Sequence, residues 1–414
     1  MHTTDPKHVE PSSPARPGVV TWAPVALALG LVALATLLPT HGPGGDEVPF
    51  WCLGCGDYAL ADAVANVVLF VPLGWALSRA GLKPYLGLAL ILTTTSGIEW
   101  LQHALISGRV ASVADILTNA LGGSAGMGLP ALARGVVATP RHASRAAIGY
   151  GALLVACLGV GLAMQVIPLP QRLDWTEGSG DTVHYVPFTG SVRALRVDGV
   201  PVTMHERLDV PARTVTDIAV DLRSGRPDTG VAQVLIAWLP NGQGWTWLEQ
   251  RDRDLHVHLA SASDGARLRG HEAWLRHTMP VTAGEPLRVR LVVRRFTYRI
   301  VIATNAGAVV REAGISAGDG WRLFTPGERE WGPWTTLLTA GWMAGLLWPL
   351  GYLASARSRA AVVVAALSAG VTLLLLPIVS GCAWLPLGGW CGAASGLLVG
   401  SHTRAPFKRG SGSD

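Results

Sequence analysis

The sequence predicts an α-helical polytopic membrane bundle of about eight spans, joined to an extracytoplasmic antiparallel β-sandwich of the jelly-roll type. Three observations predict this architecture. Hydrophobic residues make up 49% of the 414 residues and charged residues only 15%, a composition too apolar for an ordinary soluble protein. The apolar residues gather in runs of membrane-spanning length before residue 168 and after residue 333. Between these two regions, apolar and polar residues alternate, as they do in half-buried strands.

The membrane spans are predicted from length and hydropathy, because a helix needs about 20 mostly apolar residues to cross the hydrocarbon core. The first 18 residues are polar and rich in proline, and they lack the cleavage pattern of a signal peptide, so they predict a disordered cytoplasmic tail. Residues 19–167 then predict five helices, and residues 334–401 predict the remaining ones before a short tail at 402–414. The expected spans lie near 19–39, 59–78, 85–106, 113–133, 146–167, 335–355, 360–380 and 384–401.

The distribution of basic residues predicts the orientation of these spans, since lysine and arginine in short connections favour the cytoplasmic side. They fall on every second connection, alternating with connections that hold few or none. Both termini are therefore expected in the cytoplasm, and residues 168–333 outside it. The basic residues concerned are Lys7, Arg16, Arg79, Lys83, Arg134, Arg141, Arg145, Arg357, Arg359, Arg404, Lys408 and Arg409.

Residues 168–333 carry the period-two pattern of short antiparallel strands, for example in LHVHLAS, LRVRLVVRR and TYRIVIATN, with Gly, Pro, Asn and Asp between the runs. Trp245 and Trp247 stand two apart on one such strand. They are expected to share a face, where their rings could stack on sugars. The alternative is that the tryptophans fill the sandwich core, as large aromatic residues commonly do.

Histidines and cysteines give weaker signals. His256 and His258 alternate with apolar residues, so an exposed strand face explains them better than a metal site, and no metal is predicted. Cys52 and Cys55, like Cys382 and Cys391, are expected outside the cytoplasm, where thiols tend to pair. Structural disulfides are favoured over a metal site, without a fixed pairing. Cys157, in the middle of a span, is expected to pack inside the bundle.

The stretch from Ile98 to Gly123 is apolar enough for two spans and yet carries several polar groups. Such groups at membrane depth are costly and usually functional. On helices, Glu99 and Gln102 share one face, and Asp115 and Asn119 share another. Arg109 lies in the short connection between the two helices and is expected to pair with one of the acids.

These residues, with the run Asn66, Phe70, Pro72 and Gly74, resemble the VanZ-like family of bacterial membrane proteins. The hallmarks of that family are an N-x-x-x-F-x-P-x-G helix, an E-x-x-Q helix and a G-R-x5-D-x3-N-x2-G return. The resemblance covers roughly residues 19–133 and departs at Ser112 and Ala114, where relatives often carry acidic residues. It implies a membrane location and a link to lowered glycopeptide antibiotic sensitivity. In this sequence the matching residues are Glu99, Gln102, Gly108, Arg109, Asp115, Asn119 and Gly122.

The strand pattern of residues 168–333 resembles the laminin G and concanavalin-like sandwiches. This resemblance implies binding of glycans or cell-envelope polymers, and Trp245 and Trp247 are the predicted contact residues. The first hypothesis is therefore an envelope protein with an outward glycan-binding sandwich, linked to antibiotic tolerance or surface polysaccharide handling.

The second hypothesis is a membrane enzyme or transporter that acts on a lipid-linked envelope precursor. Glu99 or Asp115 would then act as general base or proton carrier, and Arg109 would hold a phosphate. Membrane lipid is an expected partner under both hypotheses, whereas no cofactor and no nucleic acid are expected. The sequence leaves enzymatic activity undecided. The side chains that would orient the head group are Asn66, Gln102 and Asn119.

Overall fold

The computed structural model describes most of the chain, and it divides these residues into two compact units. The first unit comprises residues 1–40 and 66–131, and the second comprises 41–65 and 132–414. Arg109, the predicted N-terminal tail and all but the start of the C-terminal tail lie outside the described residues. The described residues are 22–37, 49–106, 111–178, 185–210, 215–228, 230–239, 242–325, 334–355 and 358–403.

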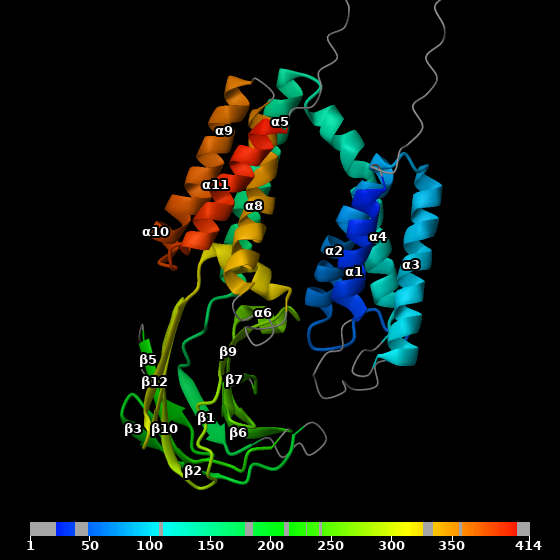
Figure 1. Ribbon diagram of the computed structural model, residues 1–414. Coiled ribbons are helices and arrows are strands. Elements are labelled where there is room, and N and C mark those ends of the chain that lie inside the picture. Colours follow the sequence, from blue (N-terminus) through cyan, green and yellow to red (C-terminus); the bar gives the residue numbers. More distant parts are fainter. Residues whose placement is uncertain are drawn as a thin grey trace, which may run out of the picture. The chain divides into compact units, whose positions relative to one another are not determined.

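The first unit is built from four helices (Figure 1). Their apolar faces meet in one core that includes Phe70, Leu73, Leu77 and Ile91, each fully buried. The helices are α1 (Ala23–Leu37), α2 (Ala59–Arg79), α3 (Pro84–Leu105) and α4 (Val113–Val136). The first residues of α2 and the last residues of α4 belong to the second unit.

Glycines bring α2 and α4 into backbone contact. A Cβ atom on Gly122 would lie 2.1 Å from the carbonyl oxygen of Val67, and one on Gly126 would lie 2.1 Å from that of Val71. No side chain fits at these two positions, so the helices pack through their backbones, as small residues allow in membrane bundles.

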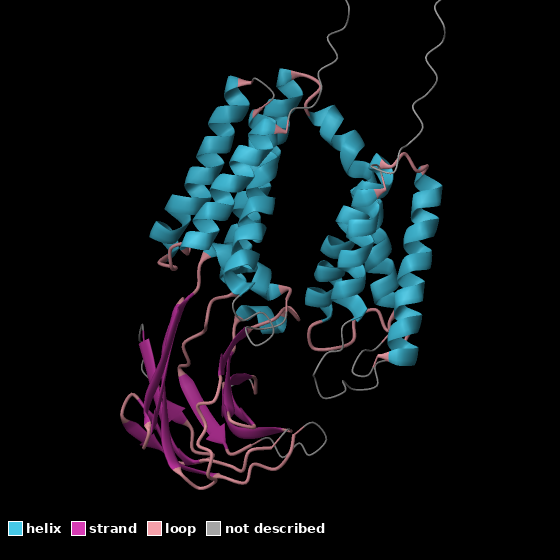
Figure 2. Ribbon diagram, in the orientation of Figure 1, coloured by secondary structure: helices cyan, strands magenta, loops and turns pink. Residues whose placement is uncertain are grey.

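The second unit contains a further helical bundle, in which α5 packs against α8 and α9, and α8 packs along α11 (Figures 1 and 2). The sequence grouped α5 with the first four helices, whereas the structure places it in this bundle. The helices are α5 (Pro140–Met164), α8 (Thr335–Ala354), α9 (Arg359–Gly370), which continues through a π-helical turn (Val371–Leu375) into α10 (Leu376–Ser380), and α11 (Leu387–His402).

Four helical segments of the described chain are long and apolar enough to cross a membrane, and α1 is a shorter apolar helix. These helices fit a membrane protein, as predicted. The four segments are Ala59–Arg79, Pro140–Met164, Thr335–Ala354 and Arg359–Ser380.

The region between α5 and α8 folds into two antiparallel sheets of six strands each, which confirms the predicted sandwich (Figure 2). One sheet has the order β4-β1-β6-β7-β8-β9 and the other has the order β12-β11-β10-β5-β2-β3. The strands are β1 (Arg172–Thr176), β2 (Ser191–Val197), β3 (Val200–Val202), β4 (Leu208–Asp209), β5 (Val215–Arg223), β6 (Val231–Trp238), β7 (Gly244–Arg251), β8 (Asp254–Leu259), β9 (His271–Leu275), β10 (Pro286–Arg294), β11 (Thr297–Thr304) and β12 (Gly307–Gly314).

The sandwich core follows from the alternation in the sequence. In β10, Leu287, Val289, Leu291 and Val293 are buried, while the residues between them face outward. Two short helical elements, α6 (Ala262–Gly265) and the 3-10 helix η2 (Ala317–Leu323), complete this unit. Asp198 and Gly199, both with positive φ, form the tight turn between β2 and β3, where a side chain is disfavoured at the glycine.

The cysteines only partly follow the expectation. Cys52 and Cys55 form a disulfide. Cys382 and Cys391 are free thiols, so the expected pairing is wrong for these two. Cys157 is exposed on α5 and does not pack inside the bundle. The spacing pattern alone did not distinguish the local pair from the distant residues.

Candidate functional site

The predicted polar residues of α3 point into the first unit. Glu99 is 4% exposed and Gln102 is 5% exposed, as expected for two residues three apart on one helical face. The Gln102 amide donates a hydrogen bond to the backbone carbonyl of Thr36, 2.8 Å away. Gln102 therefore ties α3 to the end of α1, which the sequence did not predict.

Glu99 holds the start of α4. Its Oε2 atom accepts a hydrogen bond from the backbone N–H of Ser112 at 2.9 Å. The Ser112 hydroxyl in turn accepts one from the backbone N–H of Asp115 at 3.1 Å, which caps the first turn of α4. The buried carboxylate thus lies beside a helix N-terminus, where the helix dipole favours negative charge.

Two further hydrogen bonds join the helices. The Asn66 amide on α2 donates to Oδ1 of Asp115 on α4 at 2.6 Å. The Asn119 amide on α4 donates to the hydroxyl of Thr95 on α3 at 2.8 Å. Asn119 is 2% exposed, and its carbonyl oxygen has no hydrogen-bond partner among the described residues. A buried acceptor without a donor is costly, so this oxygen is an unsatisfied group inside the cluster.

The structure therefore brings the predicted residues of α2, α3 and α4 into one polar cluster, while Arg109 lies outside the described residues. Sequence reasoning missed Thr95, Ser112 and the carbonyl of Thr36. Thr95 stands four residues before Glu99 and seven before Gln102, a spacing that places all three on one helical face. This spacing is the sequence signal that could have revealed Thr95 as a member of the cluster.

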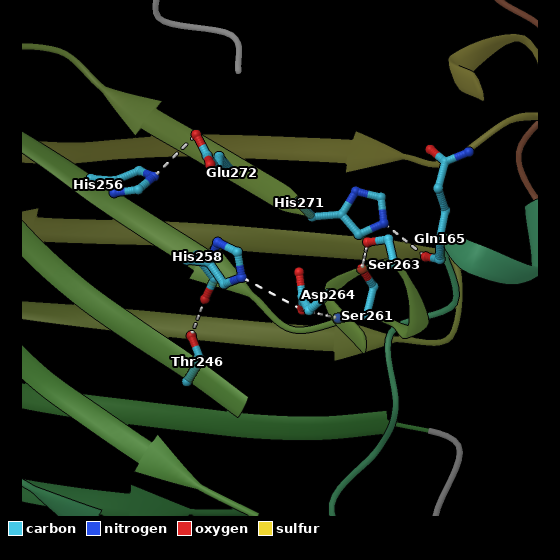
Figure 3. A network of polar contacts seen from close by, with 9 residues as sticks. All are labelled: Gln165, Thr246, His256, His258, Ser261, Ser263, Asp264, His271 and Glu272. Carbon is cyan, nitrogen blue, oxygen red and sulfur yellow. Dashed lines mark hydrogen bonds and ion pairs between the residues drawn. The ribbon is translucent and has the colours of Figure 1, made fainter. Parts of the chain in front are cut away.

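The sandwich holds a second polar network, on the face of β7, β8 and β9 that points away from the core (Figure 3). His256 Nδ1 lies 2.8 Å from Oε2 of Glu249, and its Nε2 lies 3.7 Å from Oε2 of Glu272. Its ring stacks on Trp274 with centroids 4.2 Å apart. Burial alone would lower the pKa of His256, but the two carboxylates outweigh it and raise the pKa to about 9.

His258 lies on the same face, whereas His271 pairs with Leu259 and lies on the core side of β9. The His258 ring stacks on Trp247 at 3.5 Å, and Nε2 lies 3.8 Å from Oδ2 of Asp264, which caps α6 through the backbone N–H of Ser261 (Figure 3). His271 Nε2 lies 2.7 Å from the carbonyl of Gln165. Burial lowers the pKa of His271 to about 4, so its neutral ring donates through Nε2.

A segment from the start of the chain covers part of this face. Arg269 stacks over the Tyr58 ring at 4.5 Å and forms an ion pair with Asp62 at 3.1 Å, and Arg267 donates to the carbonyl of Gly54. Burial, and next the negative charge of Glu272, raise the pKa of Tyr58. This cover helps to explain why His256 and His258 are 6% and 1% exposed, so the expectation of an exposed strand face is wrong.

The two predicted sugar-binding tryptophans do not share an accessible face. Trp245 is fully buried in the sandwich core, and its indole N–H donates to the carbonyl of Pro168 at 2.6 Å. Trp247 is partly buried under His258. The pairing of β6 with β7 shifts register next to Trp238, so simple alternation fails there. Trp245 is therefore a core residue, as in the alternative expectation.

The described residues contain no group of three or more His, Cys, Asp or Glu side chains placed to hold a metal ion. The histidine network instead connects β7, β8 and β9 to α6 and to the end of α5. Its clearest chemical feature is an imidazolium held by two carboxylates.

Comparison with known families places the first polar cluster in a recognised domain. Residues 27–134 match the family described as VanZ/LLP1, a range that contains Asn66, Glu99, Gln102, Asp115 and Asn119. Comparisons with curated proteins and with solved structures give no significant match. The match and the apolar helices together fit a membrane protein of the cell envelope. The chain therefore carries a VanZ-like domain at residues 27–134, followed by a β-sandwich of two antiparallel sheets.

Proposed function

We propose that this protein is a multi-pass membrane protein of the cell envelope whose VanZ-like helices bind the polar head group of a lipid-linked envelope precursor. The observation that carries the proposal is the carbonyl oxygen of Asn119, buried and without a hydrogen-bond partner among the described residues. It lies on α4, the helix that also presents Asp115 to Asn66. A head-group hydroxyl or amide would satisfy it.

Eight spans and an outward sandwich form part of this proposal. Eight helical segments of the described chain coincide with the predicted spans, and the basic connections alternate along them. In that orientation Glu99 and Asp115 lie near the outer ends of their helices, at the depth of the outer-leaflet head groups. The ligand would reach them from that leaflet. Arg109 remains a predicted phosphate ligand outside the described residues.

Glu99 and Asp115 are the acidic groups of the cluster. Substitutions at these two residues therefore distinguish head-group binding alone from binding followed by proton transfer. Both already accept hydrogen bonds that hold helices together. Glu99→Gln and Asp115→Asn keep the shape of each side chain and remove its ability to take up a proton. Loss of glycopeptide tolerance at a normal protein level would assign a proton-transfer role to the substituted residue. Retained tolerance would support head-group binding without proton transfer.

The binding test uses the purified full-length chain in detergent and a short-chain polyprenyl diphosphate that carries one N-acetylated sugar as the probe, with the same polyprenyl diphosphate without the sugar as the control. We expect Asn119→Ala to weaken binding of the sugar-bearing probe about fivefold, the equivalent of one hydrogen bond of about 1 kcal/mol from a sugar hydroxyl or amide to the Asn119 carbonyl oxygen. Thr118→Ala is the matched control, because within the described part of the chain that hydroxyl donates to two backbone carbonyls of its own helix. Equal affinity for the probes with and without the sugar would reject the proposal.

Glycan binding by the sandwich has less support than head-group binding. Trp245 is fully buried, and one face of the Trp247 ring is occupied by His258. A sugar would therefore have to displace packed side chains to reach Trp245, and at most one face of the Trp247 ring remains for stacking. An array of envelope glycans, probed with the full-length chain, tests this role directly.

A further inference from the structure

A basic hollow lies between the N-terminal ends of α5 and α9, in the second unit. It has a volume of about 390 Å³ and is lined by Pro140, Arg141, Ser144, Arg145 and Ser358. Ser144 and Ser358 form its base, with their hydroxyl oxygens 2.6 Å apart. Below it, Ala147, Leu353 and Ala361 form an apolar cluster that fixes the three helices together at this end.

The two serine hydroxyls have no proton left for a ligand. Ser144 donates to the carbonyl of Pro140 at 2.9 Å, so Ser358 must donate to Ser144, and Ser358 also accepts from the backbone N–H of Ala361. Donors for a ligand in the hollow must therefore come from Arg141 and Arg145. Arginine presents a planar set of donors that matches phosphate.

No carboxylate among the described residues pairs with either arginine of the hollow. Arg141 and Arg145 stand four apart on α5, where like charges repel. Neither has an ion pair within the described residues. The sequence contains no Asp or Glu between residues 116 and 173, or between residues 334 and 403, so α5, α8, α9 and α11 offer no carboxylate. Both helices also direct the positive ends of their dipoles toward this hollow, which adds to the attraction for an anion.

The surface next to the hollow is apolar. Ile148 follows Arg145 by three residues on α5 and is 57% exposed, and Leu153 is 57% exposed on the next turns. Val362 follows Ser358 by four residues on α9 and is 49% exposed. Exposed aliphatic side chains that run along two spanning helices from a pair of arginines suit acyl chains, which a free anion lacks.

We propose that this hollow binds one anionic phospholipid, with its phosphodiester at Arg141 and Arg145 and its acyl chains along α5 and α9. Basic pockets between membrane helices on the cytoplasmic side are suited to such head groups. The basic connections place this end of α5 on the cytoplasmic side. The site is separate from the head-group site proposed in the VanZ-like domain and does not depend on it.

The test measures lipid retention by native mass spectrometry of the full-length chain in detergent, with phosphatidylglycerol or phosphatidylethanolamine added. We expect one phosphatidylglycerol to be retained in preference to phosphatidylethanolamine. Arg141→Gln combined with Arg145→Gln should weaken this retention by about tenfold or more. Inorganic phosphate should not displace the lipid, because it cannot use the apolar surface.

The matched control is Arg79→Gln combined with Arg134→Gln, which removes the same charge from two exposed arginines predicted on the same side of the membrane but outside the hollow. This variant should retain phosphatidylglycerol like the unaltered chain. An equal loss in both double variants, equal retention of the two lipids, or displacement by inorganic phosphate would each overturn the proposal. Arg145→Gln alone, compared with Arg134→Gln alone, gives the same decision if a double variant fails to fold.

Discussion

Asn66 on α2 and Asp115 on α4 share a hydrogen bond of 2.6 Å, which joins the N-x-x-x-F-x-P-x-G helix to the D-x3-N helix of the VanZ-like domain. The residues are 49 positions apart in the chain. The two sequence hallmarks are therefore parts of one cluster. This contact supports a candidate site in the VanZ-like domain. It also defines a residue pair whose energetic coupling can be measured.

The Asn66–Asp115 pair should show energetic coupling. A double-mutant cycle of Asn66→Ala and Asp115→Ala should give a coupling free energy of about 1 kcal/mol, as for other polar pairs between membrane helices. The measurement is reversible unfolding of the full-length chain in bicelles. The cycle of Asn66→Ala with Gly128→Ala should be additive, because a Cβ at Gly128 meets no atom within 4 Å. Additivity in both cycles would mean that the hydrogen bond contributes nothing to stability.

Close packing of α2 on α4 should be sensitive to a single methyl group. Gly122→Ala places a Cβ 2.1 Å from the carbonyl oxygen of Val67 and must push the helices apart, which we expect to cost about 1–3 kcal/mol. Gly128→Ala on the same helix meets no atom within 4 Å and is the control. The melting temperature of each variant in detergent provides the comparison. An equal change in the two variants would exclude tight packing as the cause.

The stability of the sandwich should fall at alkaline pH because of His256. Its pKa is raised from the ordinary 6.5 to about 9 in the folded chain, so its contribution is complete below pH 6.5 and is lost as pH rises through 9. The shift corresponds to on the order of 3 kcal/mol. Tryptophan fluorescence during thermal unfolding reports the change, since Trp274 stacks on this ring.

His256→Gln is the variant that isolates this effect. It should lower stability at neutral pH and remove most of the alkaline dependence between pH 6.5 and 9. His277→Gln is the control, because that histidine side chain is 73% exposed. If His256→Gln kept the full alkaline slope, the ion cluster with Glu249 and Glu272 would not be its source.

His271 should give the opposite dependence. Its pKa is lowered from 6.5 to about 4, so its contribution is complete above pH 6.5 and is lost as pH falls through 4. His271→Gln supplies an uncharged donor for the carbonyl of Gln165 and should flatten the stability profile between pH 6.5 and 4. Unfolding by urea at a series of pH values measures it. An acid slope unchanged by the substitution would assign the dependence to other groups.

The sequence predicted the helices and strands better than it predicted which segments contact one another. Hydropathy located the ends of the helices to within six residues, and Glu99 and Gln102, which were predicted to share one helical face, are both buried. Alternation identified the strands of the sandwich. These features depend on neighbours along the chain, which is why a single sequence contains them.

Contacts between distant segments were not predictable in the same way. The pattern of His256 and His258 showed that they share one face of β8, but not that α6 and residues 49–65 approach that face. Trp245 and Trp247 stand two apart on β7, yet a register shift beside Trp238 places them in different surroundings. In each case the missing information is tertiary packing, which local periodicity does not encode.

The most direct test of the proposed function maps where a lipid-linked head group sits. A polyprenyl diphosphate sugar with a photoreactive diazirine on the sugar is added to the full-length chain, and the modified peptides are identified by mass spectrometry. We predict labelling within residues 95–119, reduced in Asn119→Ala and unchanged in Thr118→Ala. Labelling confined to the sandwich, or labelling of residues 95–119 that is equal in the two variants, would contradict a head-group site at Asn119.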